Sequence, residues 1–356
     1  MKPILCRSVL ALALGALLNV SVAFAQPAEI PTPYTYAHDI PPRLQWNENN
    51  GYCGETSFIS AGLNFGQYCS QFTARSIASP GIPQYDESAQ LLLGVNDTYA
   101  AQRMRLDADE FYYETQTRSL DFMDWVKSNT LAGNVVIIGV FNNGIILGEW
   151  TQRTDGDPEY DHIVPVLEFG SRVPFSQTRN EYSPGDVITI SDNGLYGPFG
   201  NPPEYQFYYA YRYFHFLGSR RMANRPNGPV YLLKNRPANY GIAIKGVLDL
   251  DEVTIPVRLV ASRNSEPQID HHSNTAPVPE PLTLTATVSI PNQRRAYNLY
   301  LYDDFDKTPV ANFNALAGNA VDSWVIPANS GDTFEVVINT MTDQTVIFRA
   351  VPANAP

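Results

Sequence analysis

The sequence predicts an α+β protein, in which a region of mixed helices and strands precedes an all-β domain. Leu120–Asn129 has apolar residues near helical spacing, and the glycine turn after it leads into Val135–Phe141, a run typical of a buried strand. From about residue 241 the chain changes to short alternating segments separated by Pro, Asn, Gly and Asp, the pattern of a β-sandwich of roughly 110 residues. These observations divide the chain into a mixed domain, residues 26–240, and a β-sandwich, residues 241–356.

Residues 1–25 have the pattern of a secretory signal peptide. Lys2 and Arg7 make the start basic, Val9–Val22 is apolar, and Ala23–Ala25 fits a small-x-small cleavage site. The apolar run is short for a membrane span, and no later stretch is long and apolar enough. We therefore expect cleavage near Ala25 and a secreted or periplasmic mature protein without an integral membrane segment.

The composition is acidic. The chain has 24 Lys and Arg residues against 36 Asp and Glu residues, a formal charge of −12, and loss of the two cations in the signal peptide makes it −14 (−12 − 2). Nucleic-acid binding depends on cationic contacts with phosphate, so this charge argues against a nucleic-acid partner. The sequence leaves the oligomeric state open.

The first half of the mixed domain begins with a Pro-rich stretch, residues 26–43, which predicts an extended lead-in. A helix is expected over Gly54–Leu63. The Ser-, Gly- and Gln-rich segment Asn64–Pro83 predicts a loop, and Asp86–Leu93 a short helix.

Strands dominate the second half of the mixed domain. Asn142-Asn143-Gly144 is a turn signal that makes Ile145–Trp150 a hairpin partner of the buried strand. A polar, acidic loop, Thr151–Tyr160, follows. The remaining strands are expected in His162–Phe169, Val187–Ser191 and the aromatic stretch Tyr205–Leu217, and those of the β-sandwich in Gly246–Ser262, Leu282–Pro291, Ala296–Asp304 and Thr333–Thr340.

Two cysteines, Cys53 and Cys69, remain after removal of the signal peptide. In an exported protein they could form a disulfide. A helix that begins at Cys53 would carry the chain roughly 15 Å away over its first ten residues, whereas bridged Cα atoms lie within about 7 Å of each other. We therefore expect free thiols, with Cys69 buried, and keep the disulfide as the alternative.

Cys53 stands after the polar run QWNENNGY and directly before the first helix. The unpaired N–H groups and the dipole of a helix start favour the thiolate, which is the nucleophilic form of cysteine. A nucleophilic cysteine needs a histidine base and a group that orients the base.

His162 is the best candidate for this base, because it opens a strand directly after a loop. Asp192 ends the next predicted strand, and neighbouring strands would bring the two residues together. The other histidines stand in the lead-in, the aromatic strand or a polar loop without the further ligands of a metal site, so we expect no metal. They are His38, His215, His271 and His272.

In this order the residues resemble the papain-like cysteine peptidases, and most closely their bacteriocin-processing branch. That branch has a CG-containing helix start, a helix followed by a "gxPVIvgv"-like strand, an H-x-V strand and an I-x-D strand. The corresponding stretches here are YCGETS, LAGNVVIIGVF, DHIVPVLEFG and VITISDN. The resemblance covers about residues 41–217 and says nothing of the β-sandwich.

The resemblance implies a triad of Cys53, His162 and Asp192. Papain places an asparagine where Asp192 stands here, and Asn193 is therefore the alternative orienting residue. The family also implies that the base takes the thiol proton, the thiolate attacks a carbonyl carbon, and water hydrolyses the thioester.

The resemblance further implies an oxyanion hole, made by Gln45 and the backbone N–H of Cys53. The family's glutamine usually stands about six residues before the cysteine, an offset that Asn47 occupies here, so Asn47 is the alternative donor. Glu55 departs from the family pattern, because a carboxylate that pointed into the cleft would oppose thiolate formation.

The sequence thus leads to an exported cysteine peptidase or related thiol hydrolase that acts on a peptide or protein substrate without a cofactor. The alternative is a catalytically inactive papain-like domain that, with the β-sandwich, forms a secreted binding or adhesion protein. Glu55 and the spacing of Gln45 motivate that alternative.

Overall fold

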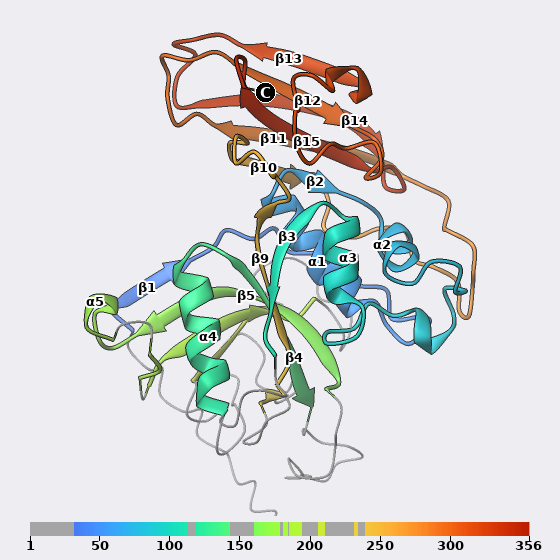
Figure 1. The fold of residues 1–356 in the computed structure, drawn as a ribbon. Helices are drawn as coiled ribbons and strands as arrows, with labels where there is room; N and C mark the ends of the chain where they lie inside the picture. The colour runs from blue at the N-terminus through green and yellow to red at the C-terminus, as the bar shows by residue number, and fades with distance from the viewer. Residues whose placement is uncertain are drawn as a thin grey trace, which may run out of the picture.

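The structure is a computed structural model, and it describes residues 32–112, 119–142, 160–178, 181–183, 185–193, 206–210, 231–233 and 239–355. It is a mixed α+β protein, with helices and an antiparallel sheet first and further antiparallel sheets in the C-terminal half (Figure 1). None of the helices in these ranges is long and apolar enough to cross a membrane.

An eight-stranded antiparallel sheet forms the first part of the molecule. Its strand order is β3-β9-β4-β5-β6-β7, with β1 paired to β5 and β8 paired to β4. The strands are β1 (Tyr34–Ala37), β3 (Leu106–Glu110), β4 (Val135–Asn142), β5 (His162–Ser171), β6 (Val187–Ser191), β7 (Gln206–Ala210), β8 (Tyr231–Leu232) and β9 (Gly241–Val247).

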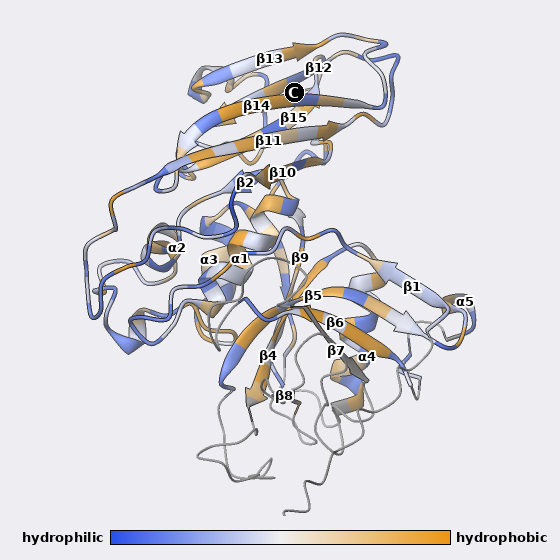
Figure 2. Cartoon of the chain, turned by 180° about the vertical axis from the view of Figure 1, so that it is seen from behind, coloured by the Kyte–Doolittle hydropathy of each residue, from blue (hydrophilic) through white to orange (hydrophobic). Residues whose placement is uncertain are grey.

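Helices pack on both faces of this sheet. Alternate side chains of β4 and β5 point to opposite faces, and both sets are apolar, so both faces are covered. Ile137 and Ile163 lie in the hydrophobic cluster on the side of α1, and Val136 and Val164 lie in the cluster on the side of α4. Figure 2 shows the hydrophobic strands β5 and β6 from behind. The helices are α1 (Cys53–Asn64), α2 (Gln71–Ala78), η1 (Glu87–Ala89), α3 (Asp97–Arg103), α4 (Ser119–Leu131) and α5 (Phe175–Thr178).

Two small antiparallel sheets form the C-terminal part. One has the order β10-β11-β14 and the other β13-β12-β15-β2. Their elements are β2 (Gln67–Tyr68), β10 (Val257–Ala261), β11 (Pro281–Ser289), β12 (Tyr297–Tyr302), η3 (Ala317–Asn319), β13 (Asp322–Ile326), β14 (Thr333–Met341) and β15 (Val346–Pro352).

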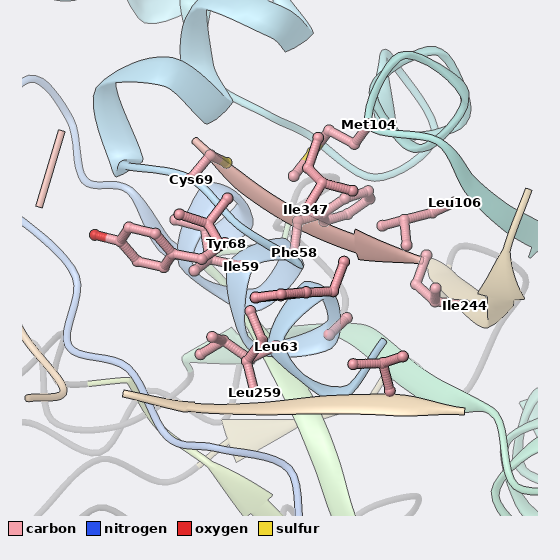
Figure 3. Packing of buried hydrophobic residues seen from close by; sticks show 14 of the residues in the cluster. Phe58, Ile59, Leu63, Tyr68, Cys69, Met104, Leu106, Ile244, Leu259 and Ile347 are labelled. Atoms are coloured by element: carbon pink, nitrogen blue, oxygen red, sulfur yellow. The ribbon is translucent and has the colours of Figure 1, made fainter. Parts of the chain in front are cut away.

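The hydrophobic core of the small sheets continues into that of the first sheet. Figure 3 shows side chains of α1 (Phe58 and Leu63) beside Leu259 from β10 and Ile347 from β15, all members of one buried cluster. Strand β2, which follows α1 directly, pairs with β15. Helix α1 therefore lies between the two parts of the molecule and contributes to both (Figure 1).

The predicted helices at residues 54–63 and 120–129 and the predicted strands at 135–141, 162–169 and 187–191 are present, with ends that differ by one or two residues. All four predicted C-terminal segments also contain strands. The local patterns were sufficient there because each element presents a continuous apolar face or run.

The segment Asn64–Pro83 was predicted as a loop, and this is wrong. It contains β2 and α2, and the polar residues that suggested a loop are largely buried: Gln67, Ser70 and Gln71 are each at most 4% exposed. Only a three-residue 3-10 turn forms within the helix expected at Asp86–Leu93. Helix α3 and strand β3 had not been predicted.

The strand that opens the expected β-sandwich, β9, belongs to the first sheet instead. It pairs with both β3 and β4, and the strands of the small sheets other than β2 all come after Val247. The signal peptide (residues 1–25), the hairpin partner Ile145–Trp150, residues 151–159 of the acidic loop and residues 211–217 of the aromatic stretch lie outside the described residues.

Candidate active site

Cys53 is the first residue of α1. The preceding Tyr52 makes no side-chain cap, so the N–H groups of the first turn keep their positive potential at the thiol. The thiol is free and partly exposed. Gly54 follows it, where a Cβ would collide with the backbone carbonyl of Leu91, and this close approach explains why glycine stands beside the cysteine.

His162 opens β5, and Asp192 follows the last residue of β6. The two strands are antiparallel, so the start of β5 lies beside the end of β6. The His162 Nε2 atom lies 2.7 Å from the backbone oxygen of Asp192 and 3.1 Å from its carboxylate Oδ1. Both side chains are fully buried. Two acceptors on one residue thus hold the same ring nitrogen.

Asp192 and Cys53 both influence the charge of the imidazole. Burial alone would lower the pKa of His162, because it disfavours a charged ring. The hydrogen bond to the Asp192 side chain and the nearby Asp192 and Cys53 groups outweigh burial and raise the pKa of His162 to about 10. The ring is therefore held as an imidazolium at neutral pH, between a carboxylate and the cysteine.

Gln45 lies beside the start of α1. Its Oε1 accepts a hydrogen bond from the backbone N–H of Tyr52 (3.0 Å), and its Nε2 donates to Asn193 Oδ1 (3.0 Å). An amide nitrogen carries two hydrogens, and the second can serve a substrate oxygen next to Cys53. Asn47, the alternative donor, has an exposed side chain.

The spacing of eight residues between Gln45 and Cys53 is accommodated by a tight loop. Asn49, Asn50 and Gly51 have φ values of 53°, 65° and 86°, three consecutive left-handed residues. Asn and Gly tolerate this conformation best. The loop absorbs the additional residues and brings the Gln45 side chain to Tyr52.

Asn193 does not contact the imidazole in any hydrogen bond that we observe. Its Nδ2 donates to the carbonyl oxygens of Ile163 (3.0 Å) and Cys53 (3.3 Å), and its backbone oxygen accepts from Gln45 N (2.9 Å). Asn193 thus joins the end of β6 to the start of α1. In the arrangement of the site, Asp192 is the residue on the histidine and Asn193 the residue on the cysteine side.

Glu55 is turned into a buried ion pair. Its Oε1 lies 2.6 Å from Arg75 Nε and accepts from the backbone N–H of Leu91 (3.1 Å). The carboxylate is neutralised by the guanidinium, which weakens the objection that the sequence raised against thiolate formation.

Arg75 also binds the loop before Cys53. Its Nη1 donates to the backbone oxygens of Asn49 (2.8 Å) and Gln84 (2.9 Å), its Nη2 donates to that of Gly51, and its guanidinium lies over the Tyr52 ring. No sequence signal predicted this role, because Arg75 lies 22 positions after Cys53 in a segment that resembled a loop.

Cys69 is a free, buried thiol, and burial raises its pKa. A buried, protonated thiol is a poor nucleophile. Within the described residues no group of three or more His, Cys, Asp and Glu side chains is arranged to hold a metal ion.

No protein-family model matches the chain, and neither a curated protein nor a solved structure does. The chemistry of the site must therefore be argued from its geometry. A cysteine at a helix start, a histidine held by a carboxylate and an amide donor beside the cysteine form a set that can carry out nucleophilic acyl transfer.

Proposed function

We propose that the protein is an exported cysteine peptidase or related thiol acyl hydrolase with a papain-like domain. Cys53 is the nucleophile, His162 the acid and base, and Asp192 the orienting residue. The substrate is a peptide or protein amide, and no cofactor takes part. The observation that carries this proposal is the buried imidazole, bound through Nε2 to Asp192 and electrostatically coupled to Cys53 at the start of α1.

The proposed reaction begins with the cysteine and histidine as an ion pair. The thiolate of Cys53 attacks the carbonyl carbon and forms a tetrahedral intermediate with a C–S bond. The His162 imidazolium gives its proton to the leaving nitrogen, the C–N bond breaks and an amine departs. The neutral imidazole then takes a proton from water while the hydroxide attacks the thioester carbon; the C–S bond breaks, the carboxylic acid departs, and the Cys53 thiolate and the His162 imidazolium are restored.

Gln45 and the Cys53 N–H supply the oxyanion hole in this proposal. The Gln45 amide is fixed on both sides, with its oxygen on the Tyr52 N–H and one of its N–H bonds on Asn193. A donor that is oriented in advance stabilises the developing negative charge without a cost of reorganisation.

The proposed compartment is the periplasm or the exterior, after cleavage near Ala25. The C-terminal strands form the second part, a β-sandwich of two small sheets that share a core with α1. A binding or adhesion function of an inactive domain is the competing hypothesis.

The proposal is tested by alkylation of the two thiols with iodoacetamide at neutral pH. We expect Cys53 to react at least about tenfold faster than the buried, protonated Cys69. The rate at Cys53 should fall in His162→Ala. Ser57→Ala, a change in the same first turns of α1, provides a control for general damage to the helix.

Hydrolysis of a casein or peptide library should then disappear in Cys53→Ala and persist in Cys69→Ala. Equal, slow alkylation of both thiols and no Cys53-dependent hydrolysis would exclude the peptidase and support the binding protein. Cys69→Ala removes a buried thiol that takes no part in the proposed reaction, so its effect should be confined to stability.

A further inference from the structure

The connection between β10 and β11, residues 262–280, lies against the residues that lead to Cys53; we call it the strap. The backbone N–H of Leu44 donates to the carbonyl oxygen of Asn264 (2.8 Å), and Asn49 Nδ2 donates to that of Ser273 (2.9 Å). Partners that are more than 200 positions apart in the chain thus hold both ends of the loop that carries Gln45.

Glu266 is the charged anchor of the strap. Glu266 is 4% exposed, and its carboxylate lies 3.3 Å from Arg43 Nη2. It also accepts a hydrogen bond from the backbone N–H of Gln71 (3.1 Å), the first residue of α2. Burial raises the pKa of Glu266 to about 7, against the effect of Arg43.

Gln71 connects this anchor to both sides of Gln45. Its Oε1 accepts from the backbone N–H of Trp46 (2.8 Å), and its Nε2 donates to the backbone oxygen of Leu44 (3.1 Å). The same Oε1 accepts from Thr56 Oγ1 (3.2 Å), in the first turn of α1. One side chain therefore fixes the backbone before and after Gln45 and ties it to the helix of Cys53.

An apolar contact supports the polar ones. Ile269 of the strap forms a small buried cluster with Trp46 and Tyr52, whose rings meet edge to face at 4.9 Å. Tyr52 is the residue immediately before Cys53, and its N–H is the group that holds Gln45. The strap thus contacts the loop at Leu44, at the Trp46–Tyr52 pair and at Asn49.

We propose that the strap is a structural part of the active centre, and that Glu266, acting through Gln71, is a positioning residue for the oxyanion donor Gln45. This inference deepens the proposed function and rests on it. The loop from Leu44 to Tyr52 has no helix or strand to order it, so its polar groups depend on side chains from elsewhere. The strands that flank the strap, β10 and β11, contribute Leu259 and Leu282 to the core shared with α1, and Leu259 is seen in that core in Figure 3.

The first test is hydrogen exchange of the full mature chain at pH 8, where wild-type Glu266 is ionised. In Glu266→Gln we expect the amides of Leu44 and Trp46 to exchange at least about tenfold faster, while those of β5 and β6 keep their rates. Glu280→Gln is the matched control: it lies at the other end of the strap, and its ion pair with Arg263 is partly exposed. Unchanged exchange at Leu44 and Trp46 would overturn the inference.

The second test separates positioning from general damage. Glu266→Gln should lower kcat for amide hydrolysis by about tenfold or more with little change in KM, because an oxyanion donor acts on the transition state. Alkylation of Cys53 by iodoacetamide forms no oxyanion and should keep its rate.

In a Gln45→Ala background, Glu266→Gln should lower kcat by less than about twofold further. The effects of two residues that act through one group are not additive. Losses of kcat that multiply in the double variant would contradict the inference.

If Glu266→Gln fails to fold, Ile269→Ala, which leaves no unpaired charge, replaces it in both tests. Absence of Cys53-dependent hydrolysis in the wild type would refute the proposed function, and hydrogen exchange would still decide the role of the strap.

Discussion

The two sides of the candidate site are held by different kinds of structure. His162 and Asp192 stand at the ends of paired strands, whose ladder satisfies the backbone and whose side chains pack in an apolar cluster. Cys53 and Gln45 depend instead on an irregular loop, whose carbonyl groups are bound by buried polar side chains such as Arg75 and Gln71.

This difference teaches where the site is vulnerable. Strand pairing distributes the restraint over many backbone hydrogen bonds, so no single side chain is essential to the position of the histidine. A loop that is ordered by a few buried side chains loses several restraints when one of them is replaced. We therefore expect substitutions on the cysteine side to affect both stability and chemistry, and conservative substitutions in the packing of the strands, other than at His162 and Asp192 themselves, to affect stability alone.

The largest effect is expected for Arg75→Met. It leaves the buried Glu55 without its cation and three carbonyl oxygens without their donor. Loss of one partner of a buried ion pair typically lowers the free energy of unfolding by about 3–5 kcal/mol. Chemical denaturation measures this loss.

Arg103→Met is the control for Arg75→Met, because its ion pair with Asp306 is largely exposed. Exposed pairs contribute about 0–1 kcal/mol. Similar losses for both variants would mean that the buried cluster does not hold the loop.

Gln45→Ala tests the cysteine side of the site, through the proposed oxyanion donor. Loss of one such donor typically lowers kcat by about 10²–10³, or ~2.7–4 kcal/mol of barrier. Asn47→Ala, two residues away and exposed, should leave kcat within about twofold of the wild type. Steady-state kinetics on one peptide substrate compares the two, and the reverse order of effects would assign the donor to Asn47.

Asp192→Asn tests the strand side of the site through the pH dependence of kcat/KM. The carboxylate helps to raise the pKa of His162 to about 10, so its removal should lower that pKa. In the proposed mechanism the imidazolium protonates the leaving group, so the alkaline loss of kcat/KM should move to lower pH by at least about one unit, or ~1.4 kcal/mol. The asparagine retains an acceptor for Nε2, so the ring should keep its orientation.

The same raised pKa gives a stability effect with a defined sign. The imidazolium's contribution to stability is fully present below about pH 6.5, the usual pKa of histidine, and is lost as the pH rises through about 10. In Asp192→Asn that loss should occur at lower pH. An unchanged alkaline limb and an unchanged pH dependence of stability would exclude the carboxylate as the cause.

The smallest effect is expected for Ile190→Val in β6. Ile190 is fully buried beside Val166, and Ile-to-Val changes cost about 0.5–1.5 kcal/mol. Cys53 should be alkylated at the wild-type rate, because the ladder that places His162 remains. A slower alkylation would show that the strand side is as sensitive as the loop.

Part of the fold and of the site could be predicted from the sequence because the relevant signals are local. The apolar run before Asn142 and the glycine turn before it predict a buried strand wherever they occur, and the strand that His162 opens is apolar over most of its length. The pairing of His162 with Asp192 required only that their two strands be neighbours.

The remaining features could not be predicted, because they depend on contacts between distant segments. Buried polar residues such as Gln71 and Arg75 resemble loop residues until the carbonyl groups that they bind are known. Likewise, β9 has the alternation of the later strands, and only its pairing with β3 and β4 places it in the first sheet.

The sequence by itself thus determined the candidate nucleophile, the candidate base and the order of the elements around them, since periodicity and helix-start signals are properties of short stretches. The tertiary structure alone decided which amide stands beside Cys53, where the charge of Glu55 goes and which part of the chain holds the loop. The physical reason is that a buried polar group must find its partner in space, and the partner of Arg43, Glu266, lies 223 positions away in the chain.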